Sequence, residues 1–433
     1  MNCHRRIVNI NNQSFYIHLG LRYYFLDTII SMVEKVSINL KNKTALSILF
    51  LVMFFVMVGF GIIIPVLPFY AENLGASPAE LGWLMAVYSL MQLLFAPMWG
   101  RISDRIGRKP VILTGIFGLA ISFFLMAIST KLWMLFAARI IGGFLSAANM
   151  PTVMAYVADI TSEEDRGKGM GIIGAAVGLG FILGPAIGGI FSERSLSFPF
   201  FIAGLSSFLT FLFVLFLLKE SLPREQLGQL RQEKVSVFKQ LNHANGILYF
   251  LQFFISLSLA GLEATFAYYV ARKIGLGTVE LGYIFMIMGL AGAIVQGGFV
   301  GVMTKKLGEP FVIQLGIITS AIGFGLILFI NDFLTATIFL SIFGIGNGVI
   351  RPSVSSLLTK TSPYGYGSTT GLLSSMDSLG RIAGPPLGGW LFTYAIGLPY
   401  ISGIVISIVA FMLFKIYQII QHRKMESDTM RMR

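Results

Sequence analysis

The stretch TSEEDRGKGMGIIGAAVGLGFILGPAIGG (residues 161–189) recurs 200 positions later as TSPYGYGSTTGLLSSMDSLGRIAGPPLGG (residues 361–389). Aligned without a gap, the two copies share the first Thr-Ser pair, a central Gly-Pro pair and the final Gly-Gly pair. A shorter repeat, ELGW at 80–83 and ELGY at 280–283, has the same offset. Because self-similarity at a fixed offset indicates a duplicated structural unit, the sequence predicts two related halves.

Long apolar runs surround both copies of the repeat. The 433 residues are 55 % hydrophobic and only 12 % charged. A helix needs about 20 apolar residues to cross the hydrocarbon layer, where backbone polar groups must be satisfied internally. We therefore predict an all-α polytopic membrane protein with twelve transmembrane helices, six in each half, over residues 45–71, 80–99, 110–129, 132–157, 168–192, 198–218, 245–271, 279–301, 310–330, 334–357, 366–392 and 397–418.

The basic residues are distributed unevenly about these spans. The formal net charge is +12, which could suggest nucleic acid as a partner. With both termini placed in the cytoplasm, however, most of the 32 Lys and Arg lie on the inner side, and the outer side holds only Lys131, Arg194, Arg272 and Lys273. This is the positive-inside pattern. It predicts a multi-pass protein of the cell membrane with cytoplasmic termini and no nucleic-acid partner.

The spans divide the chain into segments. Residues 1–43 do not resemble a cleavable signal peptide, because Arg22 and Asp27 interrupt their apolar run, and Met32 could equally be the start of the protein. The expected organisation is a cytoplasmic extension (1–43), a six-helix bundle (44–218), a cytoplasmic linker (219–242), a second six-helix bundle (243–419) and a cytoplasmic tail (420–433). Parallel halves of this kind predict alternating access to a site between them.

Several chemistries lack their usual residues. The chain has one cysteine, and its four histidines all lie outside the predicted spans, so we expect no metal site. No nucleophile–base motif and no GxxxxGK[ST] phosphate loop is present. The sequence therefore predicts neither an enzyme nor a cofactor, and it favours the proton gradient as the source of energy.

A compact cluster of charge, GRISDRIGRK (residues 100–109), separates the second and third spans. Gly100 and Gly107 permit a tight turn and a close backbone approach. The cations Arg101, Arg105, Arg108 and Lys109 are expected to hold this turn on the cytoplasmic face. Retention by positive charge does not explain Asp104, which lies among them.

Four motifs together resemble a known family. They are GFGIIIPVLPFY (59–70), GRISDRIGRK (100–109), RIIGGFLSAANMP (139–151) and GFILGPAIGG (180–189). The loop motif resembles the major facilitator superfamily, and the first-span and fifth-span motifs are similar to those of its twelve-span drug:proton antiporters. The pattern is most similar to that of the multidrug efflux pumps of Gram-positive bacteria, which export quinolones and cationic dyes.

The resemblance implies roles for several residues. Asp104 would meet the N-terminal end of the eleventh span in the outward-open state, where the helix dipole favours an anion, and so form a conformational latch with Gly100, Arg105, Gly107, Arg108 and Lys109. The alternative is that the cluster is only a topology signal. Substrate would contact Met57, Phe60, Tyr88, Gln92, Val177, Phe181 and Glu263. Helix bends and close packing are expected at Gly180, Gly184, Pro185, Gly188, Gly189, Gly384 and Pro385.

Charges within spans are costly and usually functional. Five are present: Arg139, Glu263, Arg351, Asp377 and Arg381. Glu263 lies on a helical stripe of small or polar residues, which should face protein or a cavity rather than lipid. An apolar cavity disfavours the charged form of a carboxyl and so makes it able to take up a proton. Glu263 is therefore the main candidate for proton exchange.

The other intramembrane charges have two interpretations each. Asp377 and Arg381 have the i,i+4 spacing of an ion pair, which is either a closed structural pair or a second proton site. Some similar pumps carry an aspartate where this chain has Gly348, so a scheme with two carboxylates does not transfer whole. Arg139 resembles an arginine used in proton coupling, although it could instead bind a carbonyl or extend towards the membrane surface.

These observations predict a monomeric secondary transporter that exports small amphipathic, often cationic, compounds in exchange for protons by a rocker-switch movement. An alternative is a transporter of one defined metabolite or sugar. A non-transporting sensor or a membrane enzyme fits less well, because the chain lacks a sizeable soluble domain and catalytic motifs.

Overall fold

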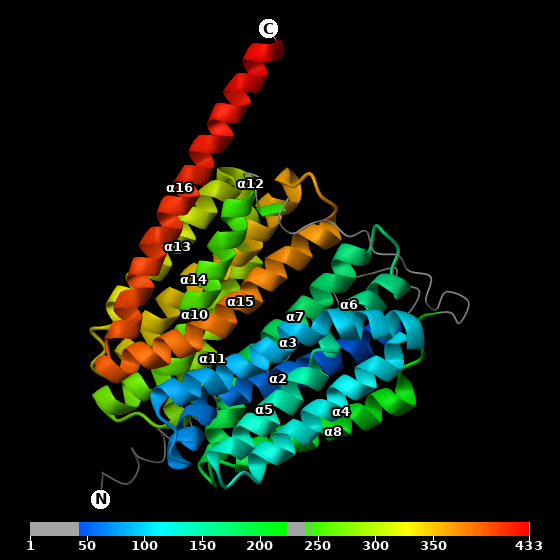
Figure 1. Ribbon diagram of the computed structural model, residues 1–433, viewed down its shortest axis with the longest axis vertical. Helices are drawn as coiled ribbons and strands as arrows, with labels where there is room; N and C mark the ends of the chain where they lie inside the picture. The colour runs from blue at the N-terminus through cyan, green and yellow to red at the C-terminus, as the bar shows by residue number, and fades with distance from the viewer. Residues whose placement is uncertain (1–42, 223–239, 242–244, 433) are drawn as a thin grey trace, which may run out of the picture.

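The computed structural model describes residues 43–222, 240–241 and 245–432. Residues 1–42 of the predicted N-terminal extension and most of the predicted linker lie outside these residues. Figure 1 shows the described helices in two groups, with the earlier helices on one side and the later helices on the other.

The first group contains the helices of the first half of the chain: α2 (Lys43–Asn73), α3 (Pro78–Ile106), α4 (Arg108–Ala127), α5 (Leu132–Ser146), α6 (Asn149–Ile160), α7 (Arg166–Ser192) and α8 (Phe198–Leu217). The second group contains α10 (Gly246–Ile274), α11 (Thr278–Ile294), the π-helical turn η2 (Val295–Val300), α12 (Gly301–Leu307), α13 (Glu309–Ile327), α14 (Phe333–Thr361), α15 (Tyr366–Tyr394) and α16 (Leu398–Met432). α16 thus continues through the residues predicted to form a tail.

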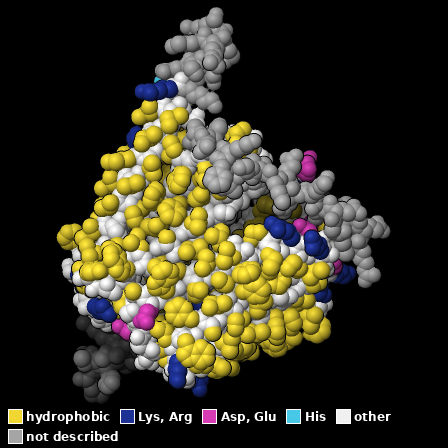
Figure 2. Space-filling view, in the orientation of Figure 1, with side chains coloured by type: hydrophobic (Ala, Val, Ile, Leu, Met, Phe, Trp, Pro, Cys, Tyr) yellow, Lys and Arg dark blue, Asp and Glu magenta, His cyan; other side chains and the backbone are white. Residues whose placement is uncertain are grey.

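All twelve predicted spans are helical. Among the described residues, eleven helices are long and apolar enough to cross a membrane. Two of these are continuous spans made of several elements: α5 with α6, and α11 with η2 and α12. α15 lies at the remaining predicted span, and its many Ser and Gly residues, together with Asp377 and Arg381, make it less apolar. Figure 2 shows hydrophobic side chains over most of the visible face, as expected of a surface in contact with lipid. The predicted all-α polytopic membrane fold is confirmed.

The ELG repeat marks equivalent helix starts. The backbone N–H of Glu80 donates to Ser77 Oγ (3.2 Å), and Ser77 N–H donates to Glu80 Oε2 (2.8 Å), which satisfies two amides that α3 leaves unpaired. At the start of α11, the N–H of Gly277 donates to Glu280 Oε2 (3.0 Å). The two copies of the repeat therefore begin corresponding helices in the two groups.

Close helix packing explains the repeated Gly-Pro pairs. α7 lies against α2 so closely that a Cβ on Gly184 would lie 2.6 Å from the carbonyl oxygen of Val58. α15 lies against α10 in the same way, and a Cβ on Gly384 would overlap the carbonyl oxygen of Leu257. In both helices the next residue is a proline within the helix. Small residues allow this approach because van der Waals contact, rather than hydrophobic burial, drives helix association in lipid.

The two groups contact each other closely at one end of the molecule. A Cβ on Gly189 of α7 would lie 2.7 Å from the carbonyl oxygen of Thr278, and one on Gly82 of α3 would overlap that of Pro385 in α15. Polar contacts join the same end: Ser192 Oγ to Thr278 Oγ1 (2.5 Å), Tyr268 OH to the Pro68 carbonyl (3.0 Å) and Arg272 Nη2 to Glu72 Oε1 (3.4 Å). We call this set of contacts the closed end.

Candidate functional site

A cavity of about 210 Å³ lies between the two groups of helices, since its wall includes residues of α2, α3, α4, α5, α6, α7, α14 and α15. Six of the seven residues predicted to contact substrate line this cavity: Met57, Phe60, Tyr88, Gln92, Val177 and Phe181. Their contact with substrate stays a prediction. The structure brings them together because α2 packs along α7, and the ring of Tyr88 on α3 lies next to that of Phe60 on α2.

One wall of the cavity is aromatic. The ring of Phe60 lies 5.8 Å from that of Tyr88 and 5.5 Å from that of Phe181, measured between centroids. The Tyr88 hydroxyl shares a hydrogen bond with Ser146 Oγ (2.7 Å) and accepts one from Gln92 Nε2 (3.2 Å). Such a wall offers flat apolar faces for a lipophilic body and a fixed polar edge beside them.

Arg139 of α5 lies behind this wall. It is only 2 % exposed, its Nε donates a long hydrogen bond to the Leu84 carbonyl (3.4 Å), and its guanidinium carbon lies 4.2 Å from the centre of the Tyr88 ring. Gly142, three residues after Arg139 on α5, lies against Ser122, which lets α4 and α5 approach here. Arg139 is therefore a cavity residue bound by a carbonyl and an aromatic ring.

The other four intramembrane charges form a network on the opposite side of the cavity. Arg381 lies between two carboxylates, with Nη1 3.4 Å from Glu263 Oε2 and Nε 3.6 Å from Asp377 Oδ2. Arg351 Nη2 lies 3.8 Å from the same Asp377 oxygen. The i,i+4 pair of Asp377 and Arg381 is thus formed, but it is not isolated: it links α10, α14 and α15. We call these four residues the charge network.

Asp377 has additional partners that the sequence analysis did not identify. Its Oδ1 accepts hydrogen bonds from Ser256 Oγ (2.5 Å) and Gln252 Nε2 (3.0 Å), both on α10. The sequence could have indicated these partners, because one face of the otherwise apolar helix α10 carries the polar residues Gln252, Ser256 and Glu263. Glu263, which we also predicted to contact substrate, is 8 % exposed and does not line the cavity; its ion-pair partner Arg381 does. Glu263 does not face lipid, in agreement with the stripe on which it lies.

The structure has no carboxylate at Gly348, where some similar pumps carry an aspartate. A Cβ at Gly348 would meet nothing closer than 3.8 Å, so the position has room for a side chain. Instead, Asp377 reaches Arg351 from α15. The second carboxylate of this site therefore comes from a different helix.

The charged loop contacts the first half of the chain and the start of the linker. Arg108 is buried and bridges Asp104 (Nη1 to Oδ1, 2.5 Å) and Asp159 (Nε to Oδ2, 3.1 Å). The N–H groups of Arg108 and Lys109 donate to the carboxylate of Glu220. The ion pair recorded for Asp104 is therefore with Arg108, and the contact with the eleventh span that we predicted for an outward-open state is not made in this structure.

The two glycines of this loop differ. Gly107 has φ +104°, and a Cβ on it would lie 2.6 Å from Glu220 Oε2, so both its backbone and its surroundings require glycine. A Cβ on Gly100 would meet nothing within 4 Å. The close approach that we expected at Gly100 was wrong, because that residue lies within α3 with one side open.

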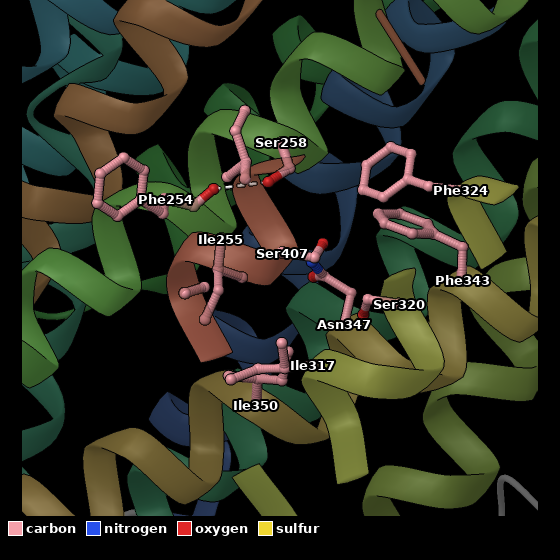
Figure 3. A pocket seen from close by; sticks show the side chains of 12 residues that line it. Phe254, Ile255, Ser258, Ile317, Ser320, Phe324, Phe343, Asn347, Ile350 and Ser407 are labelled. Atoms are coloured by element: carbon pink, nitrogen blue, oxygen red, sulfur yellow. Dashed lines mark hydrogen bonds between the residues drawn. The ribbon is translucent and has the colours of Figure 1, made fainter. Parts of the chain in front are cut away.

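A second void lies inside the later group of helices (Figure 3). Ser320, Asn347 and Ser407 point towards one another there, with Phe324 and Phe343 beside them. Its volume is about 10 Å³, which is room for at most a single water molecule. The larger cavity between the two groups is therefore the candidate substrate site.

Comparisons with known proteins agree with this architecture. The family model of the Major Facilitator Superfamily matches residues 49–372 and 248–431. The chain is 33 % identical to Multidrug resistance protein 2 of Bacillus subtilis (strain 168), over 87 % of this chain and 95 % of that protein. It is 29 % identical to Quinolone resistance protein NorA of Staphylococcus aureus (strain COL), over 87 % and 96 %.

Among solved structures, a bacterial homologue of the human lysosomal transporter Spinster, in an inward-facing and occupied conformation, has the same fold, with a TM-score of 0.72 and 15 % identity over 86 % of this chain and 96 % of that one. The resemblance predicted from the four motifs is confirmed, and the chain belongs to the major facilitator superfamily, within its multidrug-efflux type.

Proposed function

We propose that this chain exports small amphipathic compounds from the cytoplasm in exchange for protons. The observation that carries the proposal is a pair of carboxylates, the buried Glu263 and the partly buried Asp377, that share Arg381 beside a cavity between the two halves. The multidrug and quinolone resistance proteins among its relatives support the substrate class.

The partners of the two carboxylates suggest how a proton would be used. Asp377 has two arginines and two hydrogen-bond donors, whereas the ion pair of Glu263 is with Arg381 alone, among the described residues. A buried carboxylate with less compensation is the one that gains most from protonation. A proton on Glu263 would remove one buried charge, and Arg381 would then form its ion pair with Asp377 alone.

Exchange follows if a cationic part of the substrate uses the same carboxylate. The substrate cation and the proton would then each weaken the binding of the other, which is a coupling free energy between two ligands. Asp377 would serve as the second carboxylate in place of the missing one at position 348, because it lies beside Arg351.

The position of the closed end supports a direction of opening. The contacts there join the ends of helices that the charge pattern assigns to the outer side, including Glu72 and Arg272. With the outer side sealed, the cavity would face the cytoplasm, where substrate enters. Opening to the outside would require these contacts to separate while the inner ends approach, as in rocking of one half against the other.

The charged loop would act in the opposite state. Here Asp104 pairs with Arg108, within one half of the molecule. In the outward-open state, Asp104 would bind the N-terminal end of α15, since helix amides and the helix dipole favour an anion there. The loop would thus exchange a contact within one half for a contact between halves.

The test uses everted membrane vesicles, in which export is measured as uptake of the cationic dye rhodamine B ethyl ester under an imposed pH gradient. Uptake should require expression of the chain and should collapse with a protonophore. Glu263→Gln is a permanently uncharged mimic of the protonated state, so uptake by this variant should not respond to the gradient. Its rate of dye uptake should fall about tenfold or more, which is the scale of a lost charge-assisted contact.

Two further variants sharpen the test. Glu164→Gln, at an exposed carboxylate in the α6–α7 loop, should behave like the parent protein. If Glu263→Gln keeps full gradient-driven uptake and Asp377→Asn loses it, the proton site is Asp377. If both variants keep it, proton exchange at the charge network is rejected, and uptake confined to one metabolite would favour the single-substrate alternative.

A further inference from the structure

One oxygen of Asp377 is covered by two uncharged donors of α10. Gln252 and Ser256 are 1 % and 3 % exposed. Gln252 Nε2 (3.0 Å) and Ser256 Oγ (2.5 Å) both donate to Asp377 Oδ1. Gln252 Nε2 also donates to Ser256 Oγ (3.0 Å), so the three side chains form one hydrogen-bonded unit. We call Gln252 and Ser256 the donor pair.

Close helix packing brings the donor pair to Asp377. Gln252 and Ser256 are four residues apart on α10, so they lie on the same face of that helix. Gly380, three residues after Asp377 on α15, lies against the same turn of α10, and a Cβ on it would lie 2.7 Å from the Cβ of Ser256. The absence of a side chain at Gly380 lets α15 approach α10 closely enough for the short serine side chain to reach the carboxylate.

Both oxygens of Asp377 face donors. Oδ1 accepts from the donor pair, while Oδ2 lies 3.6 Å from Arg381 Nε of α15 and 3.8 Å from Arg351 Nη2 of α14. Within the part of the chain that the structure describes, no carbonyl or carboxylate oxygen is a recorded partner of Asp377. Hydrogen bonds and cations directed at a carboxylate favour its ionised form. A proton on Asp377 would have to displace one of these donors.

The orientation of the Gln252 amide fits an ionised Asp377. Its Oε1 is buried without a hydrogen-bond partner, whereas its Nε2 makes two contacts. If the amide turned over, Oε1 would face the carboxylate, which is repulsive unless Asp377 carries a proton. Buried polar atoms are nearly always paired, so the unpaired carbonyl oxygen indicates that the contacts of Nε2 hold the amide in place.

Glu263 lies on the same helix but has no such support. Its Oε2 lies 3.4 Å from Arg381 Nη1, and no uncharged donor to it is recorded among the described residues. The remaining intramembrane charge, Arg139, lines the cavity from the other half. The two carboxylates therefore share one arginine and differ in the uncharged donors that α10 supplies to Asp377 only.

We propose that Gln252 and Ser256 are positioning residues that keep Asp377 ionised, so that the exchangeable proton of the charge network binds to Glu263. This inference rests on the proposed function, because it names the residues that select the proton site. The fixed negative charge of Asp377 holds Arg381 in place while Glu263 gains and loses its proton. Without the donor pair, the two carboxylates compete for the proton.

The experiment follows the protonation of Asp377 directly. Infrared spectroscopy of the purified full chain in detergent records the carbonyl stretch of protonated carboxyl groups as the pH is lowered. The spectrum of Glu263→Gln minus that of Glu263→Gln/Asp377→Asn isolates the band of Asp377 from those of the other carboxyl groups. With the donor pair intact, this band should be absent above about pH 5, since even an exposed aspartate is protonated only near about pH 3.9.

Variants of the donor pair are then compared in the same two backgrounds. Gln252→Met and Ser256→Ala should each move the appearance of the band to a pH that is higher by about one unit or more, the scale of one hydrogen bond to a charged group. The double variant should move it further. Ser258→Ala is the matched control, because its hydroxyl donates to the Phe254 carbonyl (2.6 Å; Figure 3), and it should leave the band unchanged.

Three results would overturn this inference. They are a band at neutral pH with the donor pair intact, a band at the same pH in both single variants and the Ser258→Ala control, and no band in the double variant at any pH at which it stays folded. Size-exclusion profiles and thermal unfolding check the fold, and either single variant suffices if the other does not fold.

The vesicle assay separates this inference from the proposed function. If dye uptake is driven by the gradient but Asp377 is protonated at neutral pH with the donor pair intact, the inference fails and proton-coupled efflux stands. If the donor-pair variants shift the band as expected but uptake by the parent protein does not respond to the gradient, the donor pair does keep Asp377 ionised and the proposed function is rejected.

Discussion

Replacing Gly189 by alanine tests whether the closed end depends on the absence of a side chain. The added Cβ would lie 2.7 Å from the carbonyl oxygen of Thr278 in the other half, which is 0.7 Å short of the 3.4 Å at which ordinary contact begins. It would also lie 3.1 Å from the Cα of Val279. Both neighbours are backbone atoms, so no flexible side chain can move aside. The halves must separate here for the methyl group to fit.

The magnitude follows from the cost of overpacking. Inserting a methyl group into a close-packed contact costs about 1–3 kcal/mol. If this cost applies only to the state with the closed end, the ratio of open to closed molecules rises by about 5- to 150-fold. Gly171→Ala is the control, because Gly171 lies on the same helix and its Cβ would meet nothing within 4 Å.

The assay measures the distance between spin labels at the closed end by double electron–electron resonance. Labels at Asn73→Cys and Tyr394→Cys, in a Cys3→Ser background, report on the ends of α2 and α15, which belong to different halves. Gly189→Ala should move the distance distribution to longer values, and Gly171→Ala should leave it unchanged. If the two variants give the same distribution, backbone contact at Gly189 does not hold the closed end.

Two further predictions concern the loop and the closed end. Gly107→Ala should lower the thermal stability by about 1–3 kcal/mol, because it combines a positive φ with overlap of a carboxylate, whereas Gly100→Ala should have no effect in the same melting experiment. A double-mutant cycle on Glu72 and Arg272 should give a coupling of less than about 1 kcal/mol, because both side chains are 46 % exposed and water screens the pair. A coupling of several kcal/mol would show that this ion pair, rather than the glycine contacts, seals the end.

Part of the candidate site could be predicted because it depends on residue type within a helix. A charge in an apolar run is costly wherever the helix lies, so Glu263, Asp377 and Arg381 were identified without knowledge of the fold. The pair of Asp377 and Arg381 followed from i,i+4 spacing, since both residues belong to one helix. The link from Arg381 to Glu263 could not be predicted in this way, because it joins residues 118 positions apart on different helices.

The sequence by itself determined the class of the protein: the length of the apolar runs requires spanning helices, and the repeat at an offset of 200 requires two related halves. It also determined where close helix packing is allowed, since glycine is the residue type that leaves room for a neighbouring backbone. Only the tertiary structure decided which charges are paired. Helical spacing fixes the face on which Arg139 lies but not what faces it across a cavity, and that depends on how α5 packs against helices far away in the chain. For this reason Arg381 is shared by two carboxylates, whereas no carboxylate among the described residues forms an ion pair with Arg139.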